Sequence, residues 1–346
     1  MRSVYNAFRL TKVHLGVAII ALAGITACSS SSSTTALAPT ASQASAAHVR
    51  AQTANCPSSV LYVISSYNAE VKVYDRMHLH ADACGSIAGF NTPEGLFADQ
   101  SGNLWVADAV AKQIYKFAPG SSTPSVTLSD PNGEPQGVTV DEKSGNVYVS
   151  DYQNADATTV VEVYAGGSTT PTGALHDPAG RNGGYVAVDN KGNVYATFMT
   201  QSNTAQVDRW TGGSGDPENL GLKLISDGGI VTTRTGDLAI CDPYGYRCGI
   251  YARGSKNISH IFGHMGRGGH HRGGIGPDKQ PWLVPVGLAI DRAEKRAYVT
   301  SESLTFWRFP GPENRPNHRP SIEIKVPGLA GDGIAVFPAS RPGAPY

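Results

Sequence analysis

A recurring segment between Cys56 and the C-terminus constrains the fold more than any other feature of the chain. It reads PEGLFADQSGNLWVADAVAKQIYKFAPG from Pro93, PQGVTVDEKSGNVYVSDYQNADATTVVEVYAGG from Pro135, GGYVAVDNKGNVYATFMTQSNTAQVDRWTGG from Gly183, GGIVTTRTGDLAICDPYGYRCGIYARG from Gly228 and PVGLAIDRAEKRAYVTSESLTFWRFPGP from Pro285. Each copy contains runs of β-branched and aromatic residues between Asp, Asn and Gly turns, which predict short strands. A weaker fourth strand follows, such as SVTLSD or SIEIKV. Four short strands in a repeat of roughly 40 to 50 residues form one blade of a β-propeller.

The two ends of this region together supply the strands of one blade. The segments VLYVISS from Val60 and EVKVYD from Glu70 match the second and third strands of a blade, whereas GDGIAVFP from Gly331 matches a first strand. We therefore expect the C-terminal strand to close the ring by pairing into the N-terminal blade, because closure removes exposed sheet edges. The sequence predicts an all-β, six-bladed β-propeller with four-stranded blades over residues 56–346. Its first strands lie near Gly95, Gly137, Tyr185, Gly229, Gly287 and Gly333.

The repeats resemble NHL-type propeller repeats. The pattern of that family runs Pro-x-Gly-Ile-Ala-Val-Asp and then Gly-Asn-(Ile/Leu)-Tyr-Val-(Ala/Ser)-Asp. The resemblance covers nearly all of the chain from Cys56 onward and implies the propeller fold. It implies no particular activity, because propellers serve many functions.

The first 55 residues lie outside the repeats and indicate export. Positive residues precede LGVAIIALAGITA (residues 15–27), an apolar run too short to span a bilayer as a stable anchor. The following ITAC resembles the lipobox of bacterial lipoproteins, which implies removal of residues 1–27 and lipidation of Cys28. An ordinary secretory signal with an incidental cysteine is the alternative. Residues 28–55 are small and polar, which predicts a flexible tether. We expect an exported protein, lipid-anchored to a bacterial membrane and facing the periplasm or the cell exterior.

The remaining four cysteines are an even number, and export implies an oxidising compartment. Pairing within neighbouring couples closes the shortest loops, so we expect disulfides Cys56–Cys84 and Cys241–Cys248. A zinc site is the alternative, although the sequence has no C-x2-C spacing. The second disulfide would staple the turn DPYGYR and present Tyr244 and Tyr246, which could contact a sugar or peptide or be ordinary exposed tyrosines.

Charge and motifs favour a binding or scaffold module over an enzyme. The 28 basic residues balance the 28 acidic ones, which argues against a nucleic-acid partner and against a polybasic membrane contact. There is no G-x-S-x-G elbow, no H-E-x-x-H and no phosphate loop. We expect a monomer that binds an unknown protein or small-molecule ligand, without a certain cofactor.

The tunnel mouth is the first candidate site. First strands line the tunnel of a propeller, so the residues preceding their glycine positions should surround one mouth: Glu94, Gln136, Gly184, Gly228, Val286 and Asp332. Glu94 and Asp332 belong to neighbouring blades and could bind a divalent cation such as Ca²⁺, or could be two solvated acids. PEGLFAD also resembles the Glu-Gly segment of gluconolactonase-type propellers, in which that glutamate ligates a metal. This resemblance implies a cation-dependent, lactonase-like hydrolase as the alternative function, but only Glu94 carries over.

Two further groups are candidates on the same face. Asp108, Asp151 and Asp242 end the second strands, where they could line a site or accept hydrogen bonds from turn amides. The longest connection between blades, GHMGRGGHHRGGIGPDKQPWL (residues 263–283), contains His264, His270 and His271. These histidines could ligate Zn²⁺ or copper, the loop could capture an anion, or it could be a plain flexible connection.

Overall fold

The computed structural model describes residues 56–79, 82–152, 154–262, 284–301, 304–310, 322–324 and 333–339, with 322–324 described by backbone alone. All of them belong to one unit, Ala47–Tyr346. Several predicted features lie outside the described residues: the export signal, the tether, Cys28, Asp332, His264, His270 and His271. Among the described residues, no helix has the length and apolarity to cross a membrane.

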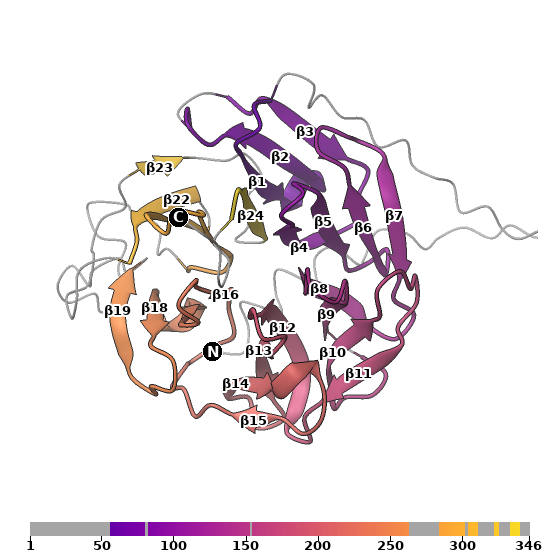
Figure 1. The fold of residues 1–346 in the computed structure, drawn as a ribbon, viewed down its shortest axis with the longest axis vertical. Coiled ribbons are helices and arrows are strands. Elements are labelled where there is room, and N and C mark those ends of the chain that lie inside the picture. The colour runs from indigo at the N-terminus through magenta and orange to yellow at the C-terminus, as the bar shows by residue number, and fades with distance from the viewer. Residues whose placement is uncertain are drawn as a thin grey trace, which may run out of the picture. The chain divides into compact units, whose positions relative to one another are not determined.

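Six four-stranded antiparallel sheets surround a common centre (Figure 1), so the predicted propeller is confirmed. Blade 1 contains, from the inner strand outward, β24 (Ile334–Phe337), β1 (Val60–Ser65), β2 (Glu70–Asp75) and β3 (Gly85–Ala88). Blade 2 contains β4 (Pro93–Ala98), β5 (Leu104–Asp108), β6 (Gln113–Phe117) and β7 (Pro124–Ser129). Blade 3 contains β8 (Glu134–Val140), β9 (Val147–Tyr152), β10 (Thr159–Tyr164) and β11 (Gly173–His176).

The second half of the ring repeats this arrangement. Blade 4 contains β12 (Gly180–Val188), β13 (Val194–Thr200), β14 (Ala205–Trp210) and β15 (Glu218–Asn219). Blade 5 contains β16 (Ile230–Thr232), β17 (Leu238–Asp242), β18 (Arg247–Tyr251) and β19 (Ile258–Phe262). Blade 6 contains β20 (Leu288–Ile290), β21 (Arg296–Thr300), β22 (Leu304–Arg308) and β23 (Ile322–Ile324). The helical segments in the described part are single 3₁₀ turns: η1 (Ser66–Asn68), η2 (Thr211–Gly213) and η3 (Pro243–Gly245).

The ring closes where the sequence predicts. β24 pairs antiparallel with β1, with Val60 opposite Phe337 and Val63 opposite Ile334 (Figure 1). The first blade is therefore completed by residues from both ends of the propeller. The Gly333 N–H also donates to the Glu94 carbonyl at 2.8 Å, which links this inner strand to the next one in the ring.

Alternate strands run in opposite directions, so the connections divide between two faces. One face carries the turns between second and third strands together with the links that enter each inner strand, and we call it the entry face. The opposite face carries the remaining turns. The inner strands therefore begin at the entry face and run away from it.

At two of the glycine positions near the entry face, Gly95 and Gly333, neighbouring inner strands approach each other too closely for a side chain. A Cβ at Gly95 would lie 2.1 Å from the Gln136 carbonyl oxygen and 2.9 Å from the Gly137 Cα. A Cβ at Gly333 would lie 2.5 Å from the Glu94 carbonyl oxygen. Both contacts are to backbone atoms, which cannot rotate away as a flexible side chain can. At these two positions the convergence of neighbouring strands requires glycine, whereas Tyr185 occupies the same repeat position in blade 4.

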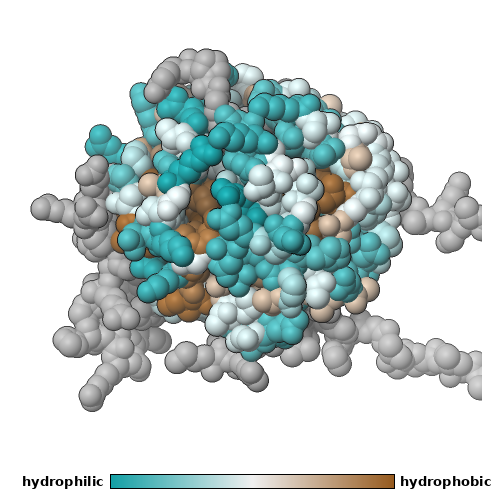
Figure 2. Space-filling model, turned by 60° about the horizontal axis from the view of Figure 1, so that its bottom comes forward, coloured by the Kyte–Doolittle hydropathy of each residue, from teal (hydrophilic) through white to brown (hydrophobic). Residues whose placement is uncertain are grey.

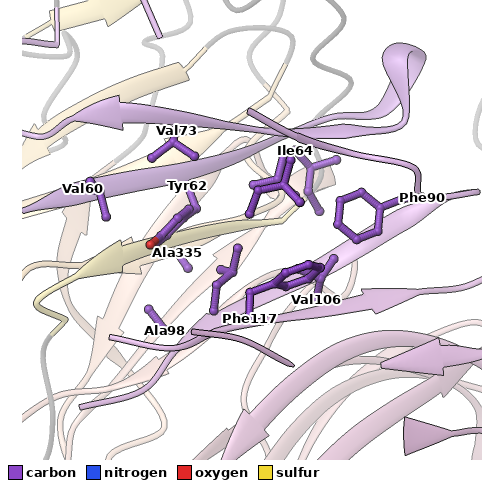
Figure 3. Packing of buried hydrophobic residues seen from close by; sticks show 12 residues of the cluster. Val60, Tyr62, Ile64, Val73, Phe90, Ala98, Val106, Phe117 and Ala335 are labelled. Atoms are coloured by element: carbon purple, nitrogen blue, oxygen red, sulfur yellow. The ribbon is translucent and has the colours of Figure 1, made fainter. Parts of the chain in front are cut away.

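Each junction between neighbouring blades contains its own cluster of buried apolar side chains. Figure 3 shows the cluster between blades 1 and 2, where Tyr62 and Ile64 of β1 face Val106 of β5 and Phe117 of β6. The alternation of strand residues produces this packing, because successive side chains point to opposite faces of a sheet. Each blade therefore packs against both of its neighbours.

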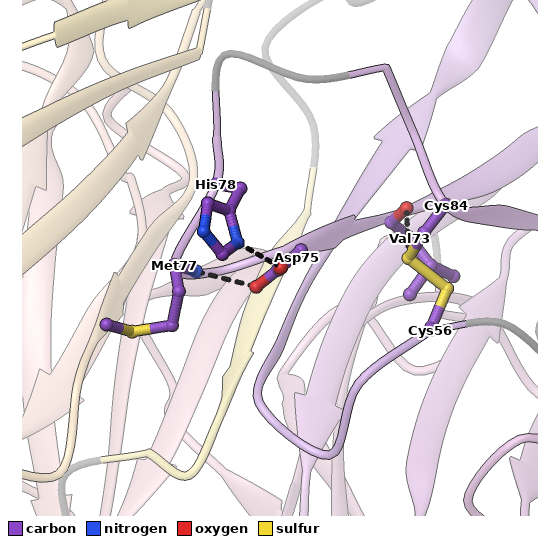
Figure 4. Close-up of a disulfide and its surroundings, with 6 residues drawn as sticks. All are labelled: Cys56, Val73, Asp75, Met77, His78 and Cys84. Atoms are coloured by element: carbon purple, nitrogen blue, oxygen red, sulfur yellow. Dashed lines mark hydrogen bonds and ion pairs between the residues drawn. A yellow bond between two sulfur atoms is a disulfide. The ribbon is translucent and has the colours of Figure 1, made fainter.

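Both predicted disulfides are confirmed. Cys56 bonds to Cys84 with Cα atoms 5.3 Å apart, so the segment before β1 is tied to the segment before β3 (Figure 4). Beside it, the Asp75 carboxylate accepts the Met77 N–H at 2.8 Å in the turn after β2 (Figure 4). Cys241 bonds to Cys248 directly across the β17–β18 pair, and both are fully buried.

We expect Gly95→Ala to lower the free energy of unfolding by about 1–3 kcal/mol, because overpacking forces backbone shifts of this cost. Urea unfolding followed by tryptophan fluorescence measures the change. Gly173→Ala is the matched control, since a Cβ at this strand glycine would meet nothing within 4 Å. Equal stability of the two variants would contradict the close-approach explanation.

Candidate functional site

The six inner strands enclose a central cavity of about 180 Å³. Its wall is mainly aliphatic, and every inner strand contributes large apolar residues, among them Leu96, Val138, Val186, Ile230, Leu288 and Ile334. This volume is smaller than the roughly 300–1,000 Å³ of pockets that hold drug-sized ligands. Figure 2 shows hydrophobic residues recessed between hydrophilic ones on the side of the molecule that it presents. The cavity suits a small apolar group.

The end of the cavity away from the entry face is polar and is joined across blades. The Gln100 N–H of blade 2 donates to the Glu142 carboxylate of blade 3 at 2.8 Å. The Lys143 ammonium of blade 3 donates to the Asn190 carbonyl of blade 4. All four residues line the cavity. These contacts hold the turns of neighbouring blades together around that end.

The five described mouth residues lie within or just before the inner strands, but they do not line the cavity, whose wall starts at the following residues. Glu94 and Gln136 are half-buried, while Gly184 and Gly228 accept hydroxyl hydrogen bonds from Ser150 (2.7 Å) and Thr197 (2.8 Å). Val286 is buried. Because Asp332 lies outside the described residues, a cation between it and Glu94 stays a prediction.

Asp108 and Asp242 bind the links that enter their own blades. The Asp108 carboxylate accepts the N–H groups of Asn91 and Thr92, both at 2.7 Å. The Asp242 carboxylate accepts the N–H groups of Ile225 at 3.1 Å and Ser226 at 3.0 Å. Both aspartates are essentially fully buried. Each fixes the link at the point where it turns into the inner strand, which is the structural role that the repeat position allows.

Asp151 occupies the same position in blade 3 but has different neighbours. Here the link amides of Asn132 and Gly133 donate, both at 3.3 Å, to Asp130 of the link itself. Asp151 instead accepts from the Asn154 side-chain amide at 3.0 Å. A Cβ at Gly133 would lie 2.7 Å from the Asp151 Cγ, so the link passes directly over this carboxyl. Asp130 has taken over the role that Asp108 and Asp242 play in their blades.

Asp130, Asp151 and Glu162 form a group of three buried acids, which we call the blade-3 acid cluster. One oxygen of each lies within 4.8 Å of the others, and their exposures are 0%, 0% and 4%. Burial first, and the neighbouring Asp130 carboxyl second, raise the pKa of Asp151 well above its ordinary value. Among the described residues, these three acids are the one group of three or more Asp, Glu, His or Cys side chains close enough to share a cation. Glu94 does not belong to this group.

Blade 4 carries a related pair of acids, in which both carboxyls accept from one side-chain amide. Asp177 of the link and Asp208 of β14 both accept from the Gln206 side-chain amide, at 3.2 and 2.8 Å. Phe198 stands where blade 3 has Asp151. Burial raises the pKa of Asp208, and a hydrogen bond with Asp177 raises it further.

Exposed apolar side chains gather on the entry face. Of the six large hydrophobic residues that are exposed in the described part of the chain, Met77 lies in the β2–β3 connection on the opposite face. The other five lie in second-to-third-strand turns or in a link: Tyr67, Val110, Ile225, Tyr244 and Tyr246.

Three of these residues form one group around Asp242, which we call the blade-5 patch: Ile225, Tyr244 and Tyr246. Their exposures are 60%, 40% and 37%. The Tyr244 N–H donates to the Ser226 hydroxyl at 2.9 Å, which joins the hairpin to the link that carries Ile225. Asp242 also accepts the Gly245 N–H at 3.1 Å, so one carboxylate fixes both segments. The sequence indicated the tyrosines, and the structure adds Ile225.

The fold defines a six-bladed β-propeller. No protein-family model matches the chain. Over 71 residues it is 35% identical to peptidyl-glycine alpha-amidating monooxygenase A of Xenopus laevis, a stretch that is 18% of this chain and only 8% of that protein.

Solved structures are similar over most of the chain. A chain in the crystal structure of a nidogen/laminin complex superposes with a TM-score of 0.61 at 14% identity, covering 80% of this chain and 98% of that one. Kuenenia stuttgartiensis hydrazine synthase gives a TM-score of 0.53 at 14% identity, covering 72% and 73%. These similarities show the fold alone.

We expect the stability of the protein to fall as the pH rises from 5 to 8, in part because of Asp208. An acid whose pKa is raised in the folded state keeps its proton there after the unfolded chain has lost it, near pH 4. The unfolded state then binds fewer protons, so the free energy of unfolding decreases with pH. Asp208→Asn should reduce this slope, measured by urea unfolding at several pH values. Asp216→Asn, at an exposed position, should leave the slope unchanged, and an unchanged slope in Asp208→Asn would contradict the assignment.

Proposed function

We propose that the chain is an exported, lipid-anchored binding module that docks a protein partner on the entry face. The observation that carries this proposal is the blade-5 patch, in which three exposed apolar side chains are held by a buried carboxylate and stapled by the Cys241–Cys248 disulfide. Tyrosine is enriched among the residues that dominate binding energy at protein interfaces. A patch of this kind suits a partner with a complementary apolar surface.

Rigidity of the patch favours binding. Association costs free energy when loops and side chains must be ordered, so a surface that is already fixed retains more of its contact energy. The hairpin that carries Tyr244 and Tyr246 is short, cross-linked at its base and hydrogen-bonded at its tip. Tyrosine adds little cost of its own, because it supplies a large contact area with two rotatable bonds.

The similar fold in a nidogen/laminin complex supports a protein as the partner, because that structure is an assembly of two proteins. The two disulfides support export, because such bonds persist in oxidising compartments. The tether predicted over residues 28–55 would have a root-mean-square span of roughly 30 Å if fully flexible. A propeller on such a tether could turn its entry face toward a partner in the membrane or beside it.

We expect Tyr244→Ser combined with Tyr246→Ser to weaken partner binding at least about tenfold, since interface hot spots contribute about 2 kcal/mol or more. Cross-linking in the producing cells, followed by purification of the full-length protein, measures capture of the partner. Met77→Ser removes an apolar side chain that is more exposed than either tyrosine, on the opposite face, and is the control. Equal capture by both variants, with unchanged thermal unfolding, would contradict the assignment of the patch.

The anchor has a separate test. We expect Cys28→Ser to move the protein from the membrane fraction to the soluble extracytoplasmic fraction, because acyl chains supply the membrane affinity. Fractionation and immunoblotting measure the distribution. Cys56→Ser with Cys84→Ser controls for cysteine loss in general and should leave the protein at the membrane. A membrane fraction that persists in Cys28→Ser would refute lipidation at this residue.

A further inference from the structure

The blade-3 acid cluster contains two oxygens without a hydrogen-bond partner in the part of the chain that the structure describes. These are Asp130 Oδ2 and Asp151 Oδ1, and both residues are 0% exposed. Among the described residues, no lysine, arginine or histidine forms an ion pair with the three acids. Buried carboxylates without compensation cost several kcal/mol each, so either a proton or a bound cation must offset the negative charge.

The other blades treat their buried acids differently. Backbone N–H groups satisfy Asp108 and Asp242, whereas blade 4 has only two acids, Asp177 and Asp208, which share the Gln206 amide and leave Asp208 Oδ2 without a partner among the described residues. In blade 3 the link amides are used by one oxygen of Asp130. Blade 3 differs from both in that three acids converge and two of their buried oxygens, Asp130 Oδ2 and Asp151 Oδ1, have no partner among the described residues.

We propose that the blade-3 acid cluster binds one Ca²⁺ ion through Asp130, Asp151 and Glu162. Three carboxylates form an all-oxygen donor set, which hard cations prefer, whereas Zn²⁺ favours imidazole and thiolate ligands. Their oxygens lie close enough together to contact one ion. The ion supplies the positive charge that the described side chains do not.

Two asparagines orient the ligands. The Asn154 side-chain amide donates to Asp151 Oδ2 at 3.0 Å and to Glu162 Oε1 at 3.1 Å. The Asn132 side-chain amide donates to the same Glu162 oxygen at 2.9 Å. Hydrogen bonds of this kind fix the carboxylates so that their remaining oxygens face the ion. Asn132 is exposed, so the cluster lies close beneath the surface and an ion can enter by displacement of this side chain.

The ion would join three segments of the propeller. Asp130 belongs to the link between blades 2 and 3, Asp151 ends β9 and Glu162 lies in β10. Because the ligands come together only in the folded chain, binding stabilises the folded state by mass action. This site is separate from the blade-5 patch, so its test does not depend on the proposed partner binding.

The test uses the full-length protein in detergent, stripped with EGTA and then titrated with CaCl₂. We expect one Ca²⁺ bound per chain by equilibrium dialysis and elemental analysis, and a rise in the midpoint of thermal unfolding. Asp151→Asn should weaken Ca²⁺ binding at least tenfold, and Glu162→Gln provides a second variant in case the first does not fold. Asp208→Asn, which changes a buried acid of blade 4, should bind Ca²⁺ as the unchanged protein does.

Three results would overturn the proposal. The first is no bound Ca²⁺ and no shift in unfolding for the unchanged protein, which would mean that Asp130 and Asp151 share a proton instead. The second is Ca²⁺ binding that is lost in Glu94→Gln but kept in Asp151→Asn, which would place the ion at the cavity mouth. The third is stronger binding of Zn²⁺ than of Ca²⁺ that still requires Asp151, which would exclude a calcium site.

Discussion

The close approach of the inner strands at the entry face is the constraint on which the rest of the structure depends. At Gly95 and Gly333 the backbone of the next blade occupies the place of a Cβ. This contact sets how near each blade lies to the next, and therefore how the apolar clusters between blades can pack. The pairing of β24 with β1 then completes the ring with the same geometry at its joint. All six junctions contain an apolar cluster, and each must pack for the ring to close.

The links between blades create a second requirement, which the repeats meet in different ways. Each link leaves an outer strand and turns sharply into the next inner strand, so its N–H groups need acceptors. Asp108 and Asp242 at the ends of second strands supply them in blades 2 and 5. Asp130 of the link supplies them in blade 3. Because the link amides of blade 3 donate to Asp130, they do not use Asp151, which lies in an acidic group instead.

The propeller fold was predictable from the sequence because the same strand and turn pattern recurs along the chain. The Pro-x-Gly start, the turn residues and the alternating strands each recur, so blade number and ring closure follow from counting. The disulfide pairing followed from the shortest loops. The candidate sites were less predictable, because Asp130, Asp151 and Glu162 come from three different segments and match no motif. The recurrence of Asp108, Asp151 and Asp242 showed a shared position, but only the contacts of each link distinguish an amide acceptor from a member of an acid cluster.

Some positions of the repeat have the same role in several blades, whereas others differ from blade to blade. The glycines and the junction clusters have the same role wherever they occur, so their presence carries no information about a ligand. The end of the second strand differs: Asp242 holds a stapled hairpin with exposed tyrosines, Asp151 joins two further acids, and Phe198 is apolar. Since all of these lie on the entry face of one scaffold, differences in fold cannot explain them. The end of the second strand therefore differs between blades for a reason other than the fold. The specific binding that we propose, of a cation at Asp151 and of a partner beside Asp242, accounts for the difference.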